Sequence, residues 1–268
     1  MKHLATIQIE FLKEARKWEE LSLDEQKGYL QRHPKSKRKL TAQSEIKTET
    51  TPEKTEILKD QLETKRETFN RDKIIKQISP NQKDARSLAN VPDEAIKQVY
   101  DSINDSLLPY GKYGQTMVKG VQTDLIGEKF DEDTFADYAP YKRKIVLNSD
   151  WFSKKNYNQM LDDIKQDVAE GYSPVGCESV KAIIDHEIAH GLYENLYGKN
   201  PFKKQIDQYL TTLQHNDVLK NLSEYATESK TETVAEAWTE YKNNKSPRLI
   251  AKTIGDLLDK AAKWQGQL

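Results

Sequence analysis

The residues with the clearest chemical potential are two histidines and a glutamate in the segment I-D-H-E-I-A-H-G-L, residues 184–192. His186 and His190 are four residues apart, so on an α-helix they share a face and lie about 6 Å apart along the axis. Both imidazoles can then bind one metal ion, about 2.0–2.1 Å from each nitrogen. Glu187 is rotated by about 100° around the helix, which puts its carboxylate beside the ion, where it can take a proton from a bound water. The alternative is that this short pattern arose by chance in an ordinary helix.

The segment around this pair has the features of a helix that runs from Ser179 to Tyr197. Its apolar face is formed by Val180, Ile183, Ile184, Ile188 and Leu192. Gly198 and the Asn200-Pro201 pair that follow are typical of a helix end. The sequence therefore predicts that both histidines lie on one packed helix.

A catalytic zinc ion needs a third protein ligand besides two histidines, and it keeps one position open. Cys177 is the only cysteine, so any site here must use histidine and carboxylate ligands. Glu194 lies on the same helical face, but roughly 12 Å along the axis from His186, too far to share one ion. His215 has a suitable side chain, but its surroundings, L-Q-H-N-D, resemble an exposed helix end.

Three glutamates at four-residue spacing provide the better candidates for completing the site. Glu232, Glu236 and Glu240 share one face of a predicted helix, without a lysine or arginine at a compensating position in that helix. Burial of such a face would be costly without a cation. A metal facing Glu232, and a metal-bound imidazole facing Glu236, would offset that cost. Two alternatives stay open: Glu232 could close a capping box with Ser229, or the whole face could be solvated.

Composition limits the classes of function. The chain has 268 residues, 36% hydrophobic and 32% charged, with a formal net charge of -1. This balance argues against a general nucleic-acid or membrane binder, and no apolar run approaches the ~20 residues of a membrane span. Residues 1–14 lack the apolar core and cleavage site of a signal peptide, so we expect no secretion by that route. A single cysteine is consistent with a reducing compartment.

The order of predicted elements indicates an α+β fold, with a small sheet and helices packed against it. We expect a helical N-terminal segment at 1–34, a charged linker or solvated helix at 35–85, and one domain at 86–268. Residues 35–72 are about half charged, which is too polar for a fold of their own. The predicted helices cover 91–107, 153–170, 179–197, 202–213, 231–241 and 249–264, and the predicted strands cover 121–126 and 141–148.

The segments I-I-D-H-E-I-A-H-G, residues 183–191, and Y-A-T-E-S-K-T-E-T-V-A-E-A-W, residues 225–238, together carry a family resemblance. They resemble the catalytic domain of anthrax-lethal-factor-type zinc metallopeptidases, a gluzincin-like domain related to domains in tailed-phage head-morphogenesis proteins. The resemblance covers about residues 86–245 and includes the order K-I-V-L-N, then D-V-A-E-G-Y-S-P-V-G, upstream. This chain departs from the family at Ser229-Lys-Thr and at Thr233-Val234, so we expect any difference from the family in the substrate preference and not in metal binding.

The resemblance implies a zincin-like fold and a role for each matching residue. It assigns zinc binding to His186, His190 and Glu232. It makes Glu187 the general base, Glu236 the residue that orients a ligand histidine, and Tyr225 the hydroxyl donor to a developing oxyanion. From its residue type alone, Tyr225 would be interpreted as a core or edge tyrosine.

The function implied by this resemblance is zinc-dependent endopeptidase activity on a protein or peptide substrate. We expect an extended substrate to pair with an exposed strand edge at Lys144–Asn148. Phage structural proteins are candidate partners, because residues 21–41 resemble a stretch of tailed-phage structural proteins. The expected location is the bacterial host cytoplasm or the phage virion. The alternatives are a catalytically silent zincin scaffold that serves as a minor phage-head or effector binding protein, and a helical assembly protein without a metal.

Overall fold

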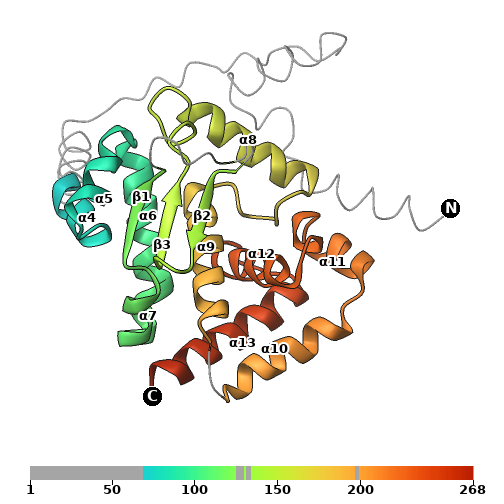
Figure 1. Ribbon diagram of the computed structural model, residues 1–268. Coiled ribbons are helices and arrows are strands. Elements are labelled where there is room, and N and C mark those ends of the chain that lie inside the picture. Colours follow the sequence, from blue (N-terminus) through green and yellow to red (C-terminus); the bar gives the residue numbers. More distant parts are fainter. Residues whose placement is uncertain (1–68, 125–129, 131–133, 197–198, 268) are drawn as a thin grey trace, which may run out of the picture. The chain divides into compact units, whose positions relative to one another are not determined.

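The computed structural model describes residues 69–124, 130, 134–196 and 199–267. The expected N-terminal helical segment at 1–34, the stretch 21–41, and the part of the expected linker up to residue 68 lie outside these residues. The described part is an α+β domain, as the sequence predicts, with a small sheet and helices around it (Figure 1). Within it, no helix combines the length and the apolar character that crossing a bilayer requires.

In the described part of the chain, the three strands come before α9 and α12, the two helices that carry the candidate metal ligands. The strands all precede α8, and the candidate residues follow it. In chain order the elements are α4 (Arg71–Ile78), α5 (Gln82–Ser87), η2 (Leu88–Asn90), α6 (Asp93–Leu107), η3 (Leu108–Tyr110), α7 (Gly111–Met117), β1 (Gly120–Thr123), β2 (Ala136–Ala139), β3 (Lys144–Leu147), α8 (Tyr157–Glu170), α9 (Val180–Glu194), α10 (Pro201–Thr212), α11 (His215–Asn221), η4 (Tyr225–Thr227), α12 (Lys230–Asn243) and α13 (Leu249–Gly266).

The sheet has the strand order β1-β3-β2, with β3 parallel to β1 and antiparallel to β2. The central strand is therefore β3, in which Ile145 pairs with Val121 on one side and with Tyr138 on the other. This corrects the expectation that Lys144–Asn148 offers an exposed edge. Sequence order places β3 last, but β1 and β2 occupy its two hydrogen-bonding sides, so the two edges of the sheet are formed by β1 and β2.

Strand β2 packs closely on α9 because Gly191, at the contact, has no side chain. A Cβ atom at Gly191 would lie 3.0 Å from the ring of Tyr138. Tyr138 is 4% exposed, and its hydroxyl donates to the carbonyl of Met117 at 2.9 Å. The residue that follows His190 therefore brings the edge strand close to the helix that carries both histidines (Figure 1).

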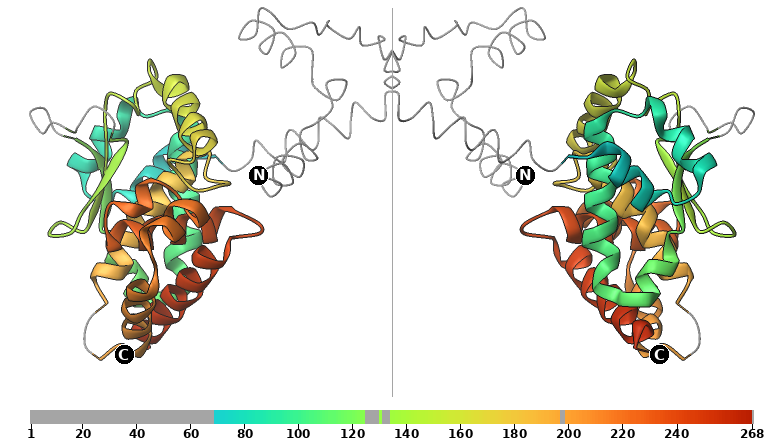
Figure 2. Two further views of the ribbon diagram at one scale, coloured as in Figure 1. Left: turned by 90° about the vertical axis from the view of Figure 1, so that its right-hand side faces the viewer. Right: turned by 90° about the vertical axis from the view of Figure 1, so that its left-hand side faces the viewer.

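Helices α9 and α12 pack against each other in the core, and α6 and α13 cover them (Figure 2). Both begin at a serine cap: Ser179 accepts from Ala182 N–H, and Ser229 accepts from Glu232 N–H at 3.1 Å. In α12 every residue from 233 to 240 is buried, so the helix has no solvated face. The interpretation of the three glutamates as a solvated face is therefore wrong, since Glu236 and Glu240 are 4% and 0% exposed.

The folded domain begins upstream of residue 86. The sequence placed 35–85 in a charged linker or solvated helix, but α4 and α5 pack against α6 and β1. Ile74 and Ile78, one turn apart on α4, are 8% and 4% exposed and join the core. The sequence prediction missed the short apolar face of α4 because most residues around it are charged, and the face is buried through its contact with α6.

Candidate metal centre

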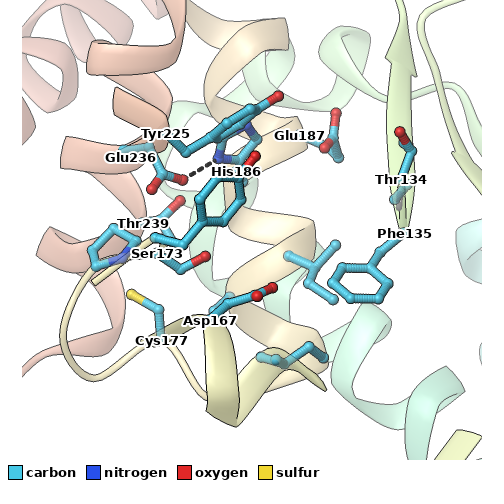
Figure 3. Close-up of a pocket in the computed structure, with 16 residues that line it drawn as sticks. Thr134, Phe135, Asp167, Ser173, Cys177, His186, Glu187, Tyr225, Glu236 and Thr239 are labelled. Carbon is cyan, nitrogen blue, oxygen red and sulfur yellow. Dashed lines mark hydrogen bonds and ion pairs between the residues drawn. The ribbon is translucent and has the colours of Figure 1, made fainter. Parts of the chain in front are cut away.

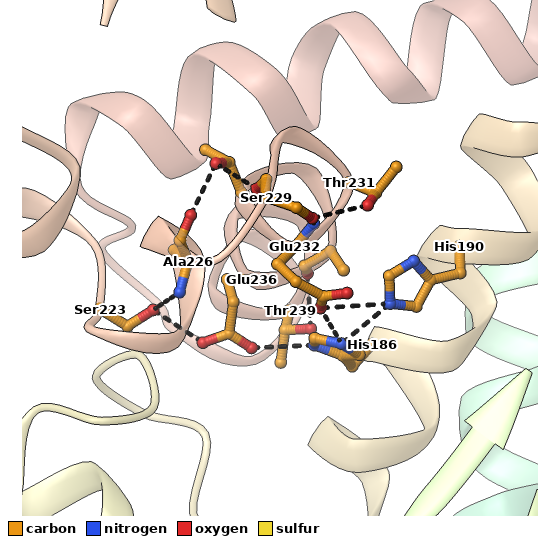
Figure 4. A network of polar contacts seen from close by, with 11 residues as sticks. His186, His190, Ser223, Ala226, Ser229, Thr231, Glu232, Glu236 and Thr239 are labelled. Carbon is orange, nitrogen blue, oxygen red and sulfur yellow. Dashed lines mark hydrogen bonds and ion pairs between the residues drawn. The ribbon is translucent and has the colours of Figure 1, made fainter. Parts of the chain in front are cut away.

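Three side chains from two helices meet at one point. The Nε2 atoms of His186 and His190 are 3.1 Å apart. An Oε2 atom of Glu232 lies 3.0 Å from the first and 3.4 Å from the second. Among the described residues these three form the one group of histidine, cysteine and acidic side chains arranged as a metal site (Figure 4). The two histidines come from successive turns of α9, and Glu232 comes from the first turn of α12.

The triangle formed by these three atoms fits a tetrahedral metal ion. Ligand atoms that bind a tetrahedral zinc ion at about 2.0–2.1 Å lie roughly 3.3 Å from one another. The observed separations of 3.0, 3.1 and 3.4 Å match that spacing. The side chains are also largely shielded from water, with exposed fractions of 12% for His186, 15% for His190 and 18% for Glu232. This group of ligands could hold a divalent metal ion.

A second glutamate fixes the orientation of His186. Oε1 of Glu236 lies 2.8 Å from the Nδ1 atom of His186, and Oε2 of Glu236 accepts from the hydroxyl of Ser223 at 2.8 Å. If Nε2 binds a metal ion, Nδ1 carries the ring proton and donates a hydrogen bond to Glu236. A carboxylate in this place holds the ring in position and makes Nε2 a better ligand.

The third glutamate of the series has a different role. Glu240 is fully buried, and Arg248, which precedes α13, binds both of its carboxylate oxygens. The sequence showed no compensating cation within α12, and the structure supplies one from the residue just before α13. Of the three glutamates spaced four residues apart, Glu232 and Glu236 thus contact histidines, and Glu240 forms an ion pair with Arg248.

Burial and neighbouring side chains set the protonation of the centre. Burial by itself would lower the pKa of His186, but its bonds to Glu232 and Glu236 outweigh this and raise that pKa well above its usual value. Burial would likewise raise the pKa of Glu232, but its bonds to the two histidines lower it to about 2. A carboxylate that stays ionised beside two imidazoles is a suitable ligand for a cation.

Glu187 and Tyr225 line the same cavity as His186, and both lie near it (Figure 3). Glu187 is 6% exposed, and burial raises its pKa to about 7, while the nearby charges of His186 and His190 oppose that rise. Burial, together with the charges of Glu232 and Glu187, raises the pKa of Tyr225, which therefore keeps its proton. The centre thus has a carboxylate able to exchange a proton and a hydroxyl able to donate one.

The cavity has a volume of about 210 Å³, and its walls combine apolar and polar side chains. The apolar part includes Phe135, Ile164, Tyr172, Cys177, Ala182 and Ile183, and the polar part includes Asp167 and Ser173. Burial raises the pKa of the Cys177 thiol, so this side chain contributes a small apolar surface and no thiolate. A dry cavity of about 150 Å³ can already take a benzene ring, so this one has room for a single apolar side chain.

The candidate ligands that the sequence set aside lie apart from this cluster. His215 begins α11 and is exposed, and Glu194 is exposed at the last residue of α9. Ser229 caps α12 through its hydroxyl, whereas the Glu232 carboxylate turns toward the histidines, away from a capping-box role. Sequence reasoning missed Ser223, although a serine just before a helical turn is a common capping signal.

Sequence reasoning also missed the contact of Tyr172 with Tyr225 next to the candidate metal centre. The Tyr172 ring lies 5.5 Å from the Tyr225 ring, which lies 5.9 Å from the His186 ring. Tyr172 follows a helix-ending glycine in a loop, where neither spacing nor residue type predicts such a contact.

Comparisons of the chain with protein-family models, with curated proteins and with solved structures found no match. The functional interpretation therefore depends on the residues and geometry of the centre. The centre consists of the His186 and His190 imidazoles, the Glu232 carboxylate, and Glu236, which orients His186. Glu187 and Tyr225 lie beside it and line the cavity.

Proposed function

We propose that this protein is a zinc-dependent endopeptidase of the anthrax-lethal-factor type, with a zincin-like fold. The observation that carries the proposal is the triangle of His186, His190 and Glu232 ligand atoms, with Glu236 bonded behind His186. A purely structural zinc site uses a closed shell of four protein ligands, whereas three ligands leave a position for water or substrate. An open centre beside a cavity favours catalysis over a structural role.

Each side chain of the centre has a separate task in peptide hydrolysis. His186, His190 and Glu232 hold zinc, which when bound supplies Lewis-acid polarisation and lowers the pKa of a water. The Glu187 carboxylate accepts the proton of the attacking water and then delivers it to the nitrogen of the leaving amine. The Tyr225 hydroxyl donates a hydrogen bond to the oxygen of the scissile carbonyl as negative charge develops there.

Strand β2 supports the binding of an extended peptide. The Asn148 N–H donates to the carbonyl of Phe135, on the residue just before β2, at 2.9 Å. Because main-chain groups alternate along an antiparallel strand, those of Ala136 and Tyr138 point away from β3, toward the edge of the sheet, where no other described strand pairs with β2. A substrate can add there as a further strand and place one apolar side chain in the cavity. The proposed edge is therefore β2, in place of the central strand expected from the sequence.

The proposed setting, inside a bacterial host or in a phage particle with phage structural proteins as partners, depends on the resemblance alone. Degradation screens on proteins encoded beside this chain would test it. Selective cleavage of a virion protein would support the setting. Cleavage restricted to unrelated proteins would oppose it while leaving the peptidase activity intact.

The decisive experiment measures metal content and hydrolysis on the same purified full-length protein. We expect about one zinc per chain, and hydrolysis of a mixed peptide library that a chelator abolishes and added zinc restores. Glu187→Gln should keep the metal and reduce kcat by roughly 10²–10⁴-fold, the usual contribution of a general acid–base group. Glu194→Gln, at an exposed position on the same helix, serves as the matched control and should retain activity.

The result also separates the alternatives. Bound metal without hydrolysis of any peptide would favour a silent zincin scaffold with a binding function. Absence of metal would favour an assembly protein and would reject the proposal. Full activity of Glu187→Gln would reject the assigned base.

A further inference from the structure

Ser223 lies between Glu236, which orients His186, and the η4 turn, which carries Tyr225 (Figure 4). It is 1% exposed. Its hydroxyl donates to Oε2 of Glu236 at 2.8 Å, and its oxygen accepts from the N–H of Ala226 at 3.2 Å. The other oxygen of Glu236 lies 2.8 Å from Nδ1 of His186. One serine thus connects a main-chain group next to Tyr225 with an imidazole of the metal centre.

Other bonds hold the same turn without reaching a histidine. The Thr233 hydroxyl donates to the carbonyl of Ala226 at 2.7 Å. The N–H of Tyr225 donates to the carbonyl of Tyr172 at 3.1 Å. These contacts fix the backbone of the turn to α12 and to the loop after α8. Of these contacts of the turn, the one made by Ser223 continues through the Glu236 carboxylate to the candidate ligand His186.

We infer that Ser223 is a positioning residue that couples the placement of Tyr225 to the orientation of His186. The inference rests on the proposed function, because it assigns His186 to a metal and Tyr225 to the substrate. The physical reason is that a buried carboxylate with one unpaired oxygen is costly, so Glu236 would rotate without the Ser223 hydroxyl. That rotation would remove the acceptor from Nδ1 of His186 and free the ring.

Removal of the hydroxyl should therefore affect both metal binding and turnover. We expect Ser223→Ala to weaken metal affinity by about tenfold or more, the usual effect of losing an outer partner of a metal ligand. At saturating metal, kcat should stay below the wild-type value because the turn that carries Tyr225 has lost its bond to Glu236. Ser223→Thr keeps the hydroxyl and should restore affinity toward the wild-type value.

Ser79→Ala is the matched control. Ser79 is also 1% exposed, and its hydroxyl bonds to the main chain of Val121, near the sheet and away from the centre. Loss of this buried hydroxyl should lower the melting temperature by a similar amount and leave metal affinity unchanged. The measurement is competition with a chromogenic chelator, on protein shown to be folded by its melting curve.

The outcomes separate this inference from the proposed function. If the wild-type protein binds no metal, the proposed function fails and the inference fails with it. If the wild type binds metal and Ser223→Ala binds it equally well, the inference alone is overturned. It is also overturned if Ser79→Ala loses as much affinity as Ser223→Ala, or if Ser223→Thr binds no better than Ser223→Ala. A selective loss in Ser223→Ala with recovery in Ser223→Thr supports it.

Discussion

Two buried carboxylate networks meet at adjacent residues of α9, and they differ in how their charge is balanced. Asp185 is fully buried and accepts from the hydroxyls of Ser102 and Ser106, each at 2.7 Å. Its second oxygen accepts from the ammonium of Lys181 at 2.8 Å and from the amide of Asn243 at 2.9 Å. This network is complete: both oxygens are bonded, and a lysine supplies the positive charge.

The network that begins at the next residue is of another kind. The carboxylates of Glu232 and Glu236 face the two imidazoles and one serine hydroxyl. Two acidic groups in a shielded place then depend on histidines for positive charge, and a divalent cation would remove this imbalance. The comparison teaches that the acid paired with lysine already has its charge balanced within the protein, whereas Glu232 and the two imidazoles that it faces form a group that could hold a divalent cation.

The largest expected effect follows from breaking the complete network. Asp185→Ala should lower the free energy of unfolding by roughly 3 kcal/mol, the lower end for a broken buried ion pair, because Lys181 is part-exposed. Metal affinity of the folded fraction should stay unchanged, since the network supplies no ligand atom. Denaturant unfolding and a metal titration on the same sample measure both quantities.

The milder Asp185→Asn variant keeps the shape of the side chain and guards against a failure to fold. It should lose less stability than Asp185→Ala and still bind metal normally. Unchanged stability with weakened metal binding would show that the two networks have been assigned the wrong way round.

Removal of a proposed ligand should give the opposite pattern. Glu232→Ala should weaken metal affinity by more than about 100-fold, because loss of an outer partner alone costs roughly 10–100-fold. For the wild type, metal at 100 times its Kd should add about 2.7 kcal/mol of stability, which a chelator removes. At the same metal concentration the variant should lose less than about 0.4 kcal/mol on chelation. Thermal melts with and without chelator test this.

Glu228→Ala is the control for that substitution, because Glu228 is exposed and lies four residues before Glu232, outside α12. Its melting temperature should fall on chelation just as the wild-type value does. A Glu232→Ala protein that still gains stability from metal would contradict the ligand assignment.

The smallest expected effect concerns a buried polar group outside both networks. Among the residues that the structure describes, none forms a hydrogen bond with the Tyr157 hydroxyl, and Tyr157 is 6% exposed. Tyr157→Phe should therefore raise the free energy of unfolding by about 1 kcal/mol at neutral pH. A lower stability of the variant at pH 7 would reveal a partner for this hydroxyl.

The pH dependence sharpens this test. Burial, with the charge of Glu94, raises the pKa of Tyr157 to about 12, against about 10 in the unfolded chain. The stability linked to the neutral hydroxyl is complete below pH 10 and is lost as pH rises through 12. The phenylalanine variant lacks this loss, so its advantage should widen between pH 9 and pH 11 in urea unfolding. A constant difference over that range would contradict the raised pKa.

The long helices could be predicted because their apolar positions repeat at helical spacing. For example, α8 ends at Gly171, as expected, with a φ of 82° that favours glycine. The sheet was predicted less well. Strand β2 is only four residues long, A-D-Y-A, with too little β-branched character to be recognised. The edge was assigned to the wrong strand, because strand order depends on pairing between distant segments.

Local spacing alone determined which side chains share a face. Helix geometry puts His186 with His190, and Glu232 with Glu236, whatever the rest of the chain does. Only the tertiary structure decided that these two pairs, which begin 46 residues apart, face each other, and that Glu240 turns to Arg248. It also decided that Ser223 supports Glu236. The reason is that backbone hydrogen bonds within each helix fix its own periodicity, whereas the approach of one helix to another is set by core packing far along the chain.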